Sequence, residues 1–312
     1  MNQIPMNQRV ADMAQPAEGG RSALWIRAIA ALPWSVLYGA AAVLAFLARF
    51  VLRFRLSIAR QNLSSCFPDR SAAQINALLT AYYRQLAQVA VESLKMAGMS
   101  AQALRRHMTA INFDQVRAES KAGRSVILLA AHQCNWEWAL QGTTMQLEVP
   151  VDAAYKPLHG VASDRELRKL RVRFGAHLIA AKRLVREVVS RRRQVQMHAV
   201  ALLADQAPTS SQGRHWLTFL GRDTAFYPGP GEIARMTGYA GFFVAMRRTA
   251  RGHYTLEIQQ ICAAHEKLDP PVFTARYAAL VEAQIRANPA DWTWIHRRWK
   301  SARPVDQHIA GS

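Results

Sequence analysis

Residues 126–140 read VILLAAHQCNWEWAL, in which a run of apolar residues gives way abruptly to polar ones. The apolar run that ends before His132 is typical of a buried strand, and the segment NWEWALQGTTM that follows is typical of a helix. Asn135 is a good N-cap, and the helix dipole favours a carboxylate such as Glu137 in the first turn. The stretch therefore predicts a strand, a turn and a helix, with His132 at the carboxyl end of the strand.

The same alternation continues through the rest of the chain. Further strands are predicted in VPVDAAY, AHLIAA and VQMHAVALLAD, with helical segments between them. Two consecutive apolar segments, AGFFVAMRRT and HYTLEIQQI, indicate paired strands, whereas residues 71–108 have helical periodicity and Gln206–Gly231 reads as a loop. Alternating strands and helices predict an α/β fold with a mixed, mostly parallel sheet covered by helices and an N-terminal membrane-associated helix.

The N-terminal helix is expected because residues 28–48 form a stretch of 21 residues without a charge. As one helix it would be about 31 Å long, close to the hydrocarbon thickness of a bilayer at about 30 Å. A buried core helix is the alternative, and a signal peptide fits less well because no A-x-A cleavage site follows. Several arginines come next, and positive flanks stay in the cytoplasm. We therefore expect the protein on the cytoplasmic face of the membrane.

Three parts of the chain are expected from these patterns. Residues 1–22 are polar and read as a loose tail, 23–55 as the membrane-anchoring helix and 56–312 as the main domain. The three cysteines are far apart and odd in number, which suits a reducing compartment and predicts neither a disulfide framework nor a zinc cluster.

The chain is strongly basic, with 40 Lys and Arg against 21 Asp and Glu and a formal net charge of +19. Such an excess predicts an anionic partner. Residues 165–193 alone contain 11 Lys or Arg and two Glu, a balance that favours anion binding over internal salt bridges, although a solvated helix face is the common alternative. No DNA-binding motif is present, so we expect no nucleic-acid partner. The terminal WTWIHRRWK has the composition of a bilayer interface or of a packed C-terminal strand.

His132 and Glu137 are the first candidates for chemistry. On one continuous helix, residues five apart diverge by about 140°. The two side chains can meet only if His132 ends the strand and Glu137 lies in the first turn of the next helix. Glu137 could then orient the imidazole and leave its other nitrogen as a base. The alternative is a capping glutamate beside an unrelated histidine.

Several segments together resemble a known family. They are ARQNLSSCFPD at 59–69, AAHQCNWEWA around His132, YKPL at 155–158, ADQAP at 204–208, WLTFLGRDTAFYPGPGEIARMTG and the terminal WTWIHRRWK. In this order they resemble the late acyltransferases of lipid A biosynthesis, in the lysophospholipid-acyltransferase superfamily. Ala204 stands where that family usually has proline, and GPGEIAR replaces a Thr/Gly-rich version. These departures concern the acceptor more than the chemistry.

The resemblance implies an O-acyltransferase that moves a fatty acyl chain from acyl carrier protein to a hydroxyl of a lipid A precursor at the inner membrane. It implies His132 as the general base, Glu137 as the group that orients it, and neither a cofactor nor a metal. Cys134 is then a packing residue, and either Arg168 or a neighbouring backbone amide is the candidate oxyanion donor. The expected substrate-binding residues are Asn135, Lys156, Arg168, Arg171, Asp205 and Gln206.

Two other functions remain open at this point. The same chemistry could act on another lipid acceptor, such as an ornithine lipid, an aryl-polyene lipid or a lysophospholipid. A non-catalytic basic protein that binds membrane or nucleic acid would have the same charge, but it would not need His132 and Glu137 together.

Overall fold

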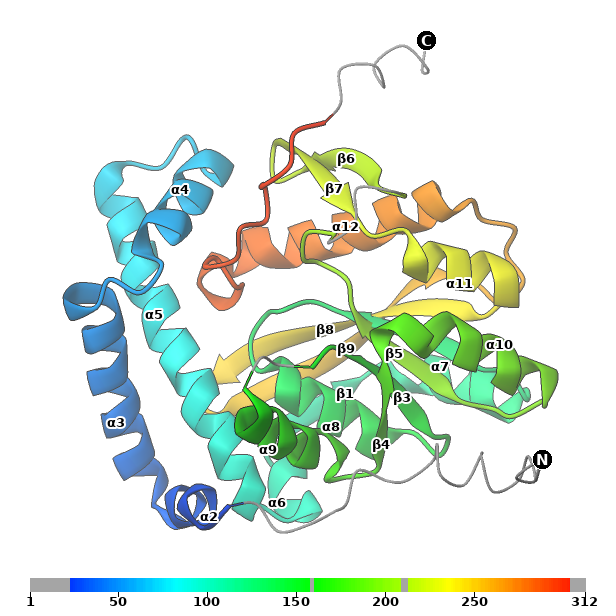
Figure 1. Cartoon of the computed structure of the whole chain (residues 1–312), viewed down its shortest axis with the longest axis horizontal. Coiled ribbons are helices and arrows are strands. Elements are labelled where there is room, and N and C mark those ends of the chain that lie inside the picture. Colours follow the sequence, from blue (N-terminus) through cyan, green and yellow to red (C-terminus); the bar gives the residue numbers. More distant parts are fainter. Residues whose placement is uncertain (1–22, 158–159, 209–212, 304–312) are drawn as a thin grey trace, which may run out of the picture.

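A seven-stranded mixed sheet forms the centre of the molecule (Figure 1). The computed structural model describes residues 23–157, 160–208 and 213–303. The strand order is β1-β9-β8-β2-β5-β3-β4, and each neighbouring pair is parallel except β8 with β9. The strands are β1 (Met108–Ile111), β2 (Val126–Ala130), β3 (Val151–Tyr155), β4 (Ala176–Ala180), β5 (Ala199–Leu203), β8 (Ala240–Ala250) and β9 (His253–Cys262). The predicted fold class is confirmed.

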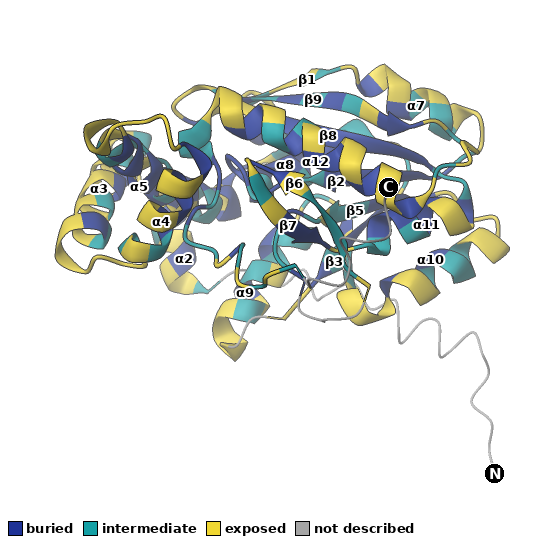
Figure 2. Cartoon of the chain, turned by 90° about the horizontal axis from the view of Figure 1, so that it is seen from above, coloured by how far each residue is buried: buried dark blue, intermediate teal, exposed yellow. Residues whose placement is uncertain are grey.

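Helices cover both faces of this sheet, so the central strands are buried and the outer helix faces are exposed (Figure 2). On β2, Ile127 and Leu129 enter one hydrophobic cluster, whereas Val126 and Leu128 enter the other. Burial on both faces explains why this strand is apolar without interruption. One cluster contains residues of α4 (Leu56–Cys66), α10 (Leu184–Arg193), α11 (Gly229–Thr237) and α12 (Pro270–Ala287); the other contains residues of α7 (Phe113–Lys121), α8 (Trp136–Gln146) and α9 (Val161–Val172).

Two parts of the fold differ from the sequence prediction. The region 108–121 forms β1 and α7, which the pattern did not indicate. The expected loop from Gln206 to Gly231 contains a hairpin of β6 (His215–Phe219) and β7 (Arg222–Phe226). Its two-residue turn has positive φ at Leu220 (52°) and Gly221 (74°). Leucine seldom adopts that conformation, so the usual Asn-Gly signal of such a turn is missing.

The apolar N-terminal run forms two helices, not the one that was expected. Helix α2 (Leu24–Ala31) ends before Pro33, whose ring and missing N–H interrupt the helix, and α3 (Trp34–Phe46) continues into a π-helix at Leu47–Val51. The 18 residues Trp34–Val51 are long and apolar enough to cross a membrane, and little of this segment is buried in the protein.

Helix α3 packs along the long helix α5 (Ala72–Lys95) at one side of the molecule (Figure 1). Leu37 and Ala41 form this contact with Ala87 and Val91. The other side of the segment exposes large apolar side chains: Val36, Val43, Leu44, Phe46, Leu47, Phe50 and Val51. An apolar face of this kind favours membrane association over a core helix.

We expect Val36→Glu combined with Val43→Glu to release the protein from membranes in high salt, whereas the wild-type protein stays bound. Both side chains are exposed, and each carboxylate placed in hydrocarbon costs at least about 2 kcal/mol. Salt weakens attraction between charges but does not weaken the burial of hydrocarbon.

The matched control is Val185→Glu with Val272→Glu, on exposed faces of α10 and α12, which should behave as wild type. Sedimentation of membranes with and without salt measures the bound fraction. Extraction of the wild-type protein by salt alone would show that this helix is not an anchor.

Candidate active site

His132 and Asp205 meet at the carboxyl edge of the sheet. Strands β2 and β5 are parallel neighbours in which Ala130 pairs with Leu203, so the residues two positions further along lie side by side. His132 Nδ1 lies 2.7 Å from Asp205 Oδ1, and the backbone N–H of His132 donates to Asp205 Oδ2 at 2.9 Å. The carboxylate therefore holds both the backbone and the ring of His132.

Asp205 is held ionised inside the protein. Its side chain is only 1% exposed, and Trp292 Nε1 donates a third hydrogen bond to Oδ2 at 2.8 Å. Burial by itself would raise the pKa of this carboxyl, but the charge of His132 and the hydrogen bonds from His132 and Trp292 lower it below its usual value. The negative charge of Asp205 beside Nδ1 favours the tautomer with the proton on Nδ1, which leaves Nε2 of His132 as the nitrogen able to accept a proton.

The C-terminal segment returns to cover this pair. Trp292 forms an antiparallel bridge with Gln133, and the backbone N–H and Oγ1 of Thr293 donate to the carbonyl of His132 at 3.1 and 2.8 Å. Trp292 and Trp294 are 2% and 0% exposed. The prediction that WTWIHRRWK packs against the protein is therefore confirmed for these two residues. The segment does not form the predicted strand: it follows a 3-10 turn at Pro289–Asp291 and forms an isolated bridge.

Asn62, which lies in the segment ARQNLSSCFPD, connects helix α4 to the C-terminal segment. Its Nδ2 on α4 donates to the carbonyls of Trp294 and His296 at 2.8 and 2.9 Å. Since the same segment carries Trp292, Asn62 fixes the strip of chain that reaches Asp205. Neither Asn62 nor Trp292 was predicted as a site residue, because their contacts join positions 232 residues apart for Asn62 with Trp294 and 87 residues apart for Trp292 with Asp205.

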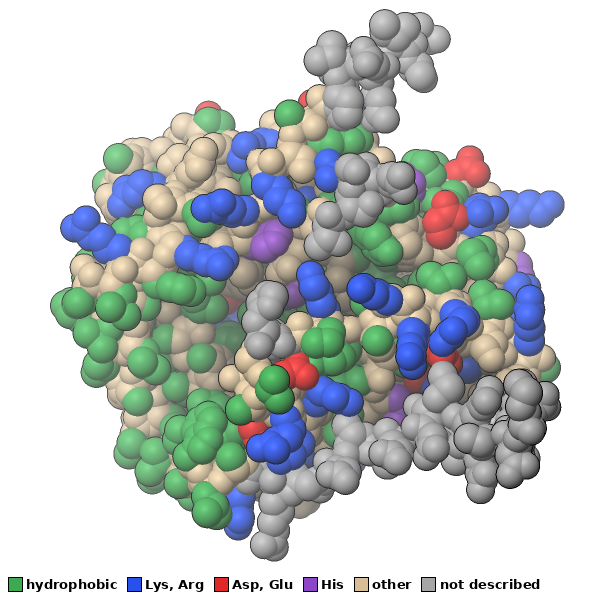
Figure 3. Space-filling view, in the orientation of Figure 1, with side chains coloured by type: hydrophobic (Ala, Val, Ile, Leu, Met, Phe, Trp, Pro, Cys, Tyr) green, Lys and Arg blue, Asp and Glu red, His purple; other side chains and the backbone are tan. Residues whose placement is uncertain are grey.

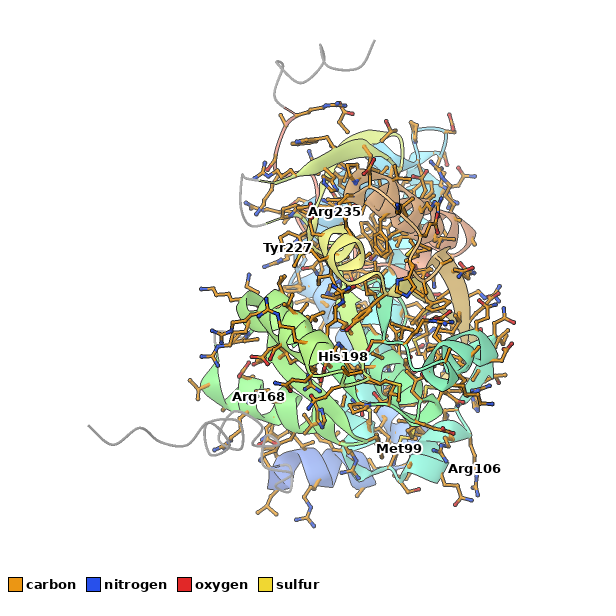
Figure 4. The ribbon with its side chains drawn as sticks, turned by 90° about the vertical axis from the view of Figure 1, so that its right-hand side faces the viewer. Met99, Arg106, Arg168, His198, Tyr227 and Arg235 are labelled. Carbon is orange, nitrogen blue, oxygen red and sulfur yellow. The ribbon has the colours of Figure 1, made fainter. Side chains whose placement is uncertain are left out.

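A cavity of about 630 Å³ opens beside His132. Its inner wall is largely apolar, with Leu128, Leu140 and Val244 among its residues, and Tyr227, labelled beside α11 in Figure 4, lines it at an exposed position. His132, Glu137, Lys156, Arg171 and Gln206 supply its polar groups. The arrangement provides one basic nitrogen at the wall of a largely apolar chamber.

Glu137 does not make the expected hydrogen bond to His132. Its Oε2 and Oε1 accept from Nε and Nη2 of Arg171 at 2.8 and 2.6 Å, and Oε1 also accepts from Trp136 Nε1 at 3.1 Å. The first turn of α8 directs the carboxylate toward α9, and Asp205 takes the position at Nδ1. The prediction that Glu137 orients the imidazole is corrected: in the structure that carboxylate is Asp205.

The other predicted substrate-binding residues divide into two groups. Lys156, Arg171 and Gln206 line the cavity. Asn135 is fully buried, with Oδ1 accepting from the backbone N–H of Trp138 and Nδ2 donating to Glu92, each at 3.1 Å. The predicted N-cap is confirmed, and this use of both side-chain ends removes Asn135 from the cavity surface. Asp205 likewise lies behind His132 and not in the cavity wall.

Arg168 also lies outside the cavity lining. It is exposed on α9, labelled in Figure 4, with its guanidinium 5.7 Å from the centre of the Tyr155 ring. Of the two arginines on this helix face, only Arg171 lines the cavity. A sequence pattern places both on the same basic helix and cannot choose between them.

The basic run 165–193 is less one-sided than its composition indicates. Arg171 pairs with Glu137, Lys169 with Glu166 at 2.9 Å, and Arg191 with the buried Asp152 at 3.1 Å. The expectation that such charges lack internal partners is wrong for these residues, because Glu137 and Asp152 from outside the run and Glu166 within it pair with them. Others are exposed, and Lys and Arg gather over α10 in Figure 3. The exposed ones are Arg165, Arg168, Arg173, Lys182, Arg183, Arg186, Arg192 and Arg193.

Cys134 is a packing residue in this arrangement. It is 2% exposed, and its thiol donates to the carbonyl of Met246 at 3.2 Å. Burial, with a further contribution from the nearby Asp291, raises the pKa of this thiol well above its usual value, which makes it a poor nucleophile. Across residues 23–157, 160–208 and 213–303, no three His, Cys, Asp or Glu side chains are grouped so that they could hold a metal ion.

Known proteins are similar to this chain over most of its length. The chain is 27% identical over 286 residues to the lipid A biosynthesis palmitoleoyltransferase of Escherichia coli (strain K12), a match that covers 91% of this chain and 90% of the relative. It matches the lipid A biosynthesis acyltransferase of Shigella flexneri to the same extent. The profile of the family described as bacterial lipid A biosynthesis acyltransferase matches residues 22–301. The resemblance seen in the sequence is thereby confirmed, and the chain belongs to the bacterial lipid A biosynthesis acyltransferase family.

Proposed function

We propose that this acyltransferase moves a fatty acyl chain from the thioester of acyl carrier protein to a hydroxyl of a lipid A precursor, at the cytoplasmic face of the inner membrane. Family membership supports acyl transfer in lipid A biosynthesis. The observation that carries the mechanism is the hydrogen-bonded pair of His132 and Asp205 at the wall of an apolar cavity. The donor, the site of reaction and the roles below are our proposal.

His132 acts as the general base. Its Nδ1–H is donated to Asp205, so Nε2 accepts the proton of the acceptor hydroxyl while that oxygen attacks the thioester carbonyl. The C–O bond forms and the C–S bond breaks, and the imidazolium returns the proton to the leaving thiolate. Asp205 stabilises the imidazolium, as the aspartate does in Ser-His-Asp hydrolases. The lipid hydroxyl is itself the nucleophile, which agrees with a buried and unreactive Cys134.

Arg171 supplies positive charge for the tetrahedral intermediate. It lines the cavity, and Glu137 holds its guanidinium through two parallel hydrogen bonds. A paired, planar guanidinium is fixed in direction before the substrate arrives, which is the property that oxyanion stabilisation requires. Glu137 is then a positioning residue that acts through Arg171.

The surroundings of the cavity fit the two proposed substrates. Its apolar interior suits a fatty acyl chain. Lys156 at its edge and Arg168 nearby are exposed cations, and an acidic carrier protein or a phosphorylated lipid would complement them. The exposed apolar face of α3 would keep the enzyme at the leaflet in which the lipid acceptor lies.

The function is tested by mass spectrometry of lipid A from a strain that lacks the protein, with a purified assay of acyl-carrier-protein thioester and lipid A precursor. We expect lipid A in the deletion strain to lack one acyl chain and the purified protein to restore it. An unchanged lipid A together with an altered ornithine lipid or lysophospholipid would replace the proposed acceptor.

His132→Ala should lower the rate of acyl transfer by at least about 10²-fold with the fold intact, the low end for loss of a general base. Asp205→Asn should cause a loss of at least about the same size. It should also shift the acid limb of the pH–rate profile to lower pH, because a protonated imidazole is less stable without the neighbouring negative charge. Thermal melting and pH–rate profiles measure both effects.

The control for Asp205→Asn is Glu148→Gln, an exposed carboxylate outside the cavity lining, which should leave the rate and the profile unchanged. A folded His132→Ala protein that retains near-native turnover would exclude His132 from the reaction. An unmoved acid limb in Asp205→Asn would show that this carboxylate only supports the fold.

Arg171→Lys and Glu137→Gln should each lower kcat by roughly 10²-fold, comparable to the loss of one oxyanion donor. Lysine keeps the charge but loses the two-pronged hydrogen bond, and glutamine releases the guanidinium. The double variant should be no slower than the slower single variant, because both changes break the same pair. The acid limb of the pH profile should stay in place in all three proteins. If Glu137→Gln moves that limb as Asp205→Asn does, Glu137 acts on His132 directly.

A further inference from the structure

A second cavity, of about 840 Å³, lies where the apolar N-terminal segment ends. Residues of the π-helix, the following turn, α4 and α5 line it, and it shares no residue with the cavity beside His132. Its lining is Arg49, Phe50, Arg53, Leu56, Ser57, Arg60 and Asn76. We call it the arginine pocket. Three of its seven lining residues are cations and none is an acid.

Arg49 is the most unusual of these residues because it is buried with no hydrogen-bond or ion-pair partner among the described residues. Its residue is only 7% exposed, and its Nε and Nη1 atoms are buried with no hydrogen bond. The ring of Phe50 lies 4.8 Å from its guanidinium, which adds a cation–π contact but no acceptor. A buried charge normally has a hydrogen-bonded counter-charge, so this position calls for an anion that the described chain does not supply.

The two neighbouring arginines also have no carboxylate partner within the part of the chain that the structure describes. Arg60 donates from Nη2 to the neutral Asn76 at 2.9 Å, and Arg53 makes no hydrogen bond or ion pair with any residue in 23–157, 160–208 or 213–303. Arg53 also has a positive φ of 47°, a conformation that non-glycine residues seldom adopt. The fold thus brings three unpaired cations to one cavity, although their mutual repulsion opposes it.

The surroundings indicate what kind of anion fits. The chain next to the pocket exposes large apolar side chains, and Figure 3 shows hydrophobic residues along the side of the molecule that α3 occupies, with Lys and Arg above them. The apolar residues adjoining the pocket are Phe46, Leu47, Val51, Leu52 and Phe54. A cationic pocket beside an apolar face matches a bilayer lipid, whose phosphate lies next to its acyl chains.

We propose that the arginine pocket binds the phosphate of an anionic bilayer lipid, with Arg49, Arg53 and Arg60 as its donors. Guanidinium groups form paired hydrogen bonds to phosphate oxygens, and the exposed apolar residues contact the acyl chains of the same lipid. The site lies on different elements from the reaction centre, so it is an anchoring site and not a substrate site. A free phosphate would satisfy the charge but would gain nothing from the apolar border.

Native mass spectrometry of the full-length protein in a non-ionic detergent tests this proposal. The probes are phosphatidylglycerol, zwitterionic phosphatidylcholine and inorganic phosphate, each titrated separately. The variants are Arg49→Gln and the exposed pair Arg53→Gln with Arg60→Gln; the matched control is Arg84→Gln, an exposed arginine on α5 outside the pocket. The pair variant keeps the test valid if Arg49→Gln lowers thermal stability.

We expect one phosphatidylglycerol adduct on the wild-type and Arg84→Gln proteins, with affinity reduced at least about tenfold in both pocket variants, as for the loss of charge-assisted hydrogen bonds. Phosphatidylcholine and inorganic phosphate should bind clearly more weakly. An equal loss in Arg84→Gln would mean that only net charge matters and would overturn the proposal. Equal binding of phosphatidylcholine would exclude an anionic lipid, and tighter binding of inorganic phosphate would make the pocket a free-phosphate site. None of these readouts depends on acyl transfer.

Discussion

The parallel pairing of β2 with β5 is the constraint on which the site depends. In this register Ala130 lies opposite Leu203, and the chains that leave the two strands place His132 against Asp205. Ile127 and Leu129 of β2 pack into one hydrophobic cluster and Val126 and Leu128 into the other, so a shift of register by one residue would exchange the two sets between the faces and would also separate His132 from Asp205. The same hydrophobic packing that stabilises the sheet therefore also sets the geometry of the proposed base and its carboxylate.

A buried carboxylate needs several donors to remain charged, and here they come from distant parts of the chain. The backbone and ring of His132 supply two contacts and Trp292 supplies the third. Asn62 on α4, the carbonyl of His132 and the bridge to Gln133 help to hold the C-terminal segment that carries Trp292. The helix that follows the apolar N-terminal segment is thus connected to the reaction centre through hydrogen bonds, and α4, the C-terminal segment and the sheet act as one unit.

The arginines near the active-site cavity and near the arginine pocket differ in whether the protein supplies a carboxylate partner. Arg171 and Arg191 are paired with carboxylates of the protein itself, Glu137 and Asp152. Arg49, Arg53 and Arg60 line a cavity that has no carboxylate among its lining residues, and in our proposal a lipid phosphate supplies the negative charge there. Net charge alone does not distinguish these cases. The difference depends on which acidic side chains the fold brings within hydrogen-bonding distance.

Local patterns in the sequence determined most of the secondary structure, the α/β class, the N-cap at Asn135 and the position of His132 at a strand end, because each depends on neighbours within a few residues. The sequence motifs also identified the family. The hairpin around Leu220 and the break at Pro33 are local features too. The hairpin was not predicted because it lacks the usual turn residues, and the break was not predicted because the long apolar run indicated a single helix.

Only the tertiary structure decided that Asp205 and not Glu137 contacts His132, that Arg171 and not Arg168 lines the cavity, and that Trp292 is buried against the site. Each of these choices joins residues that are far apart in the chain, and strand order and helix orientation set the distances between them.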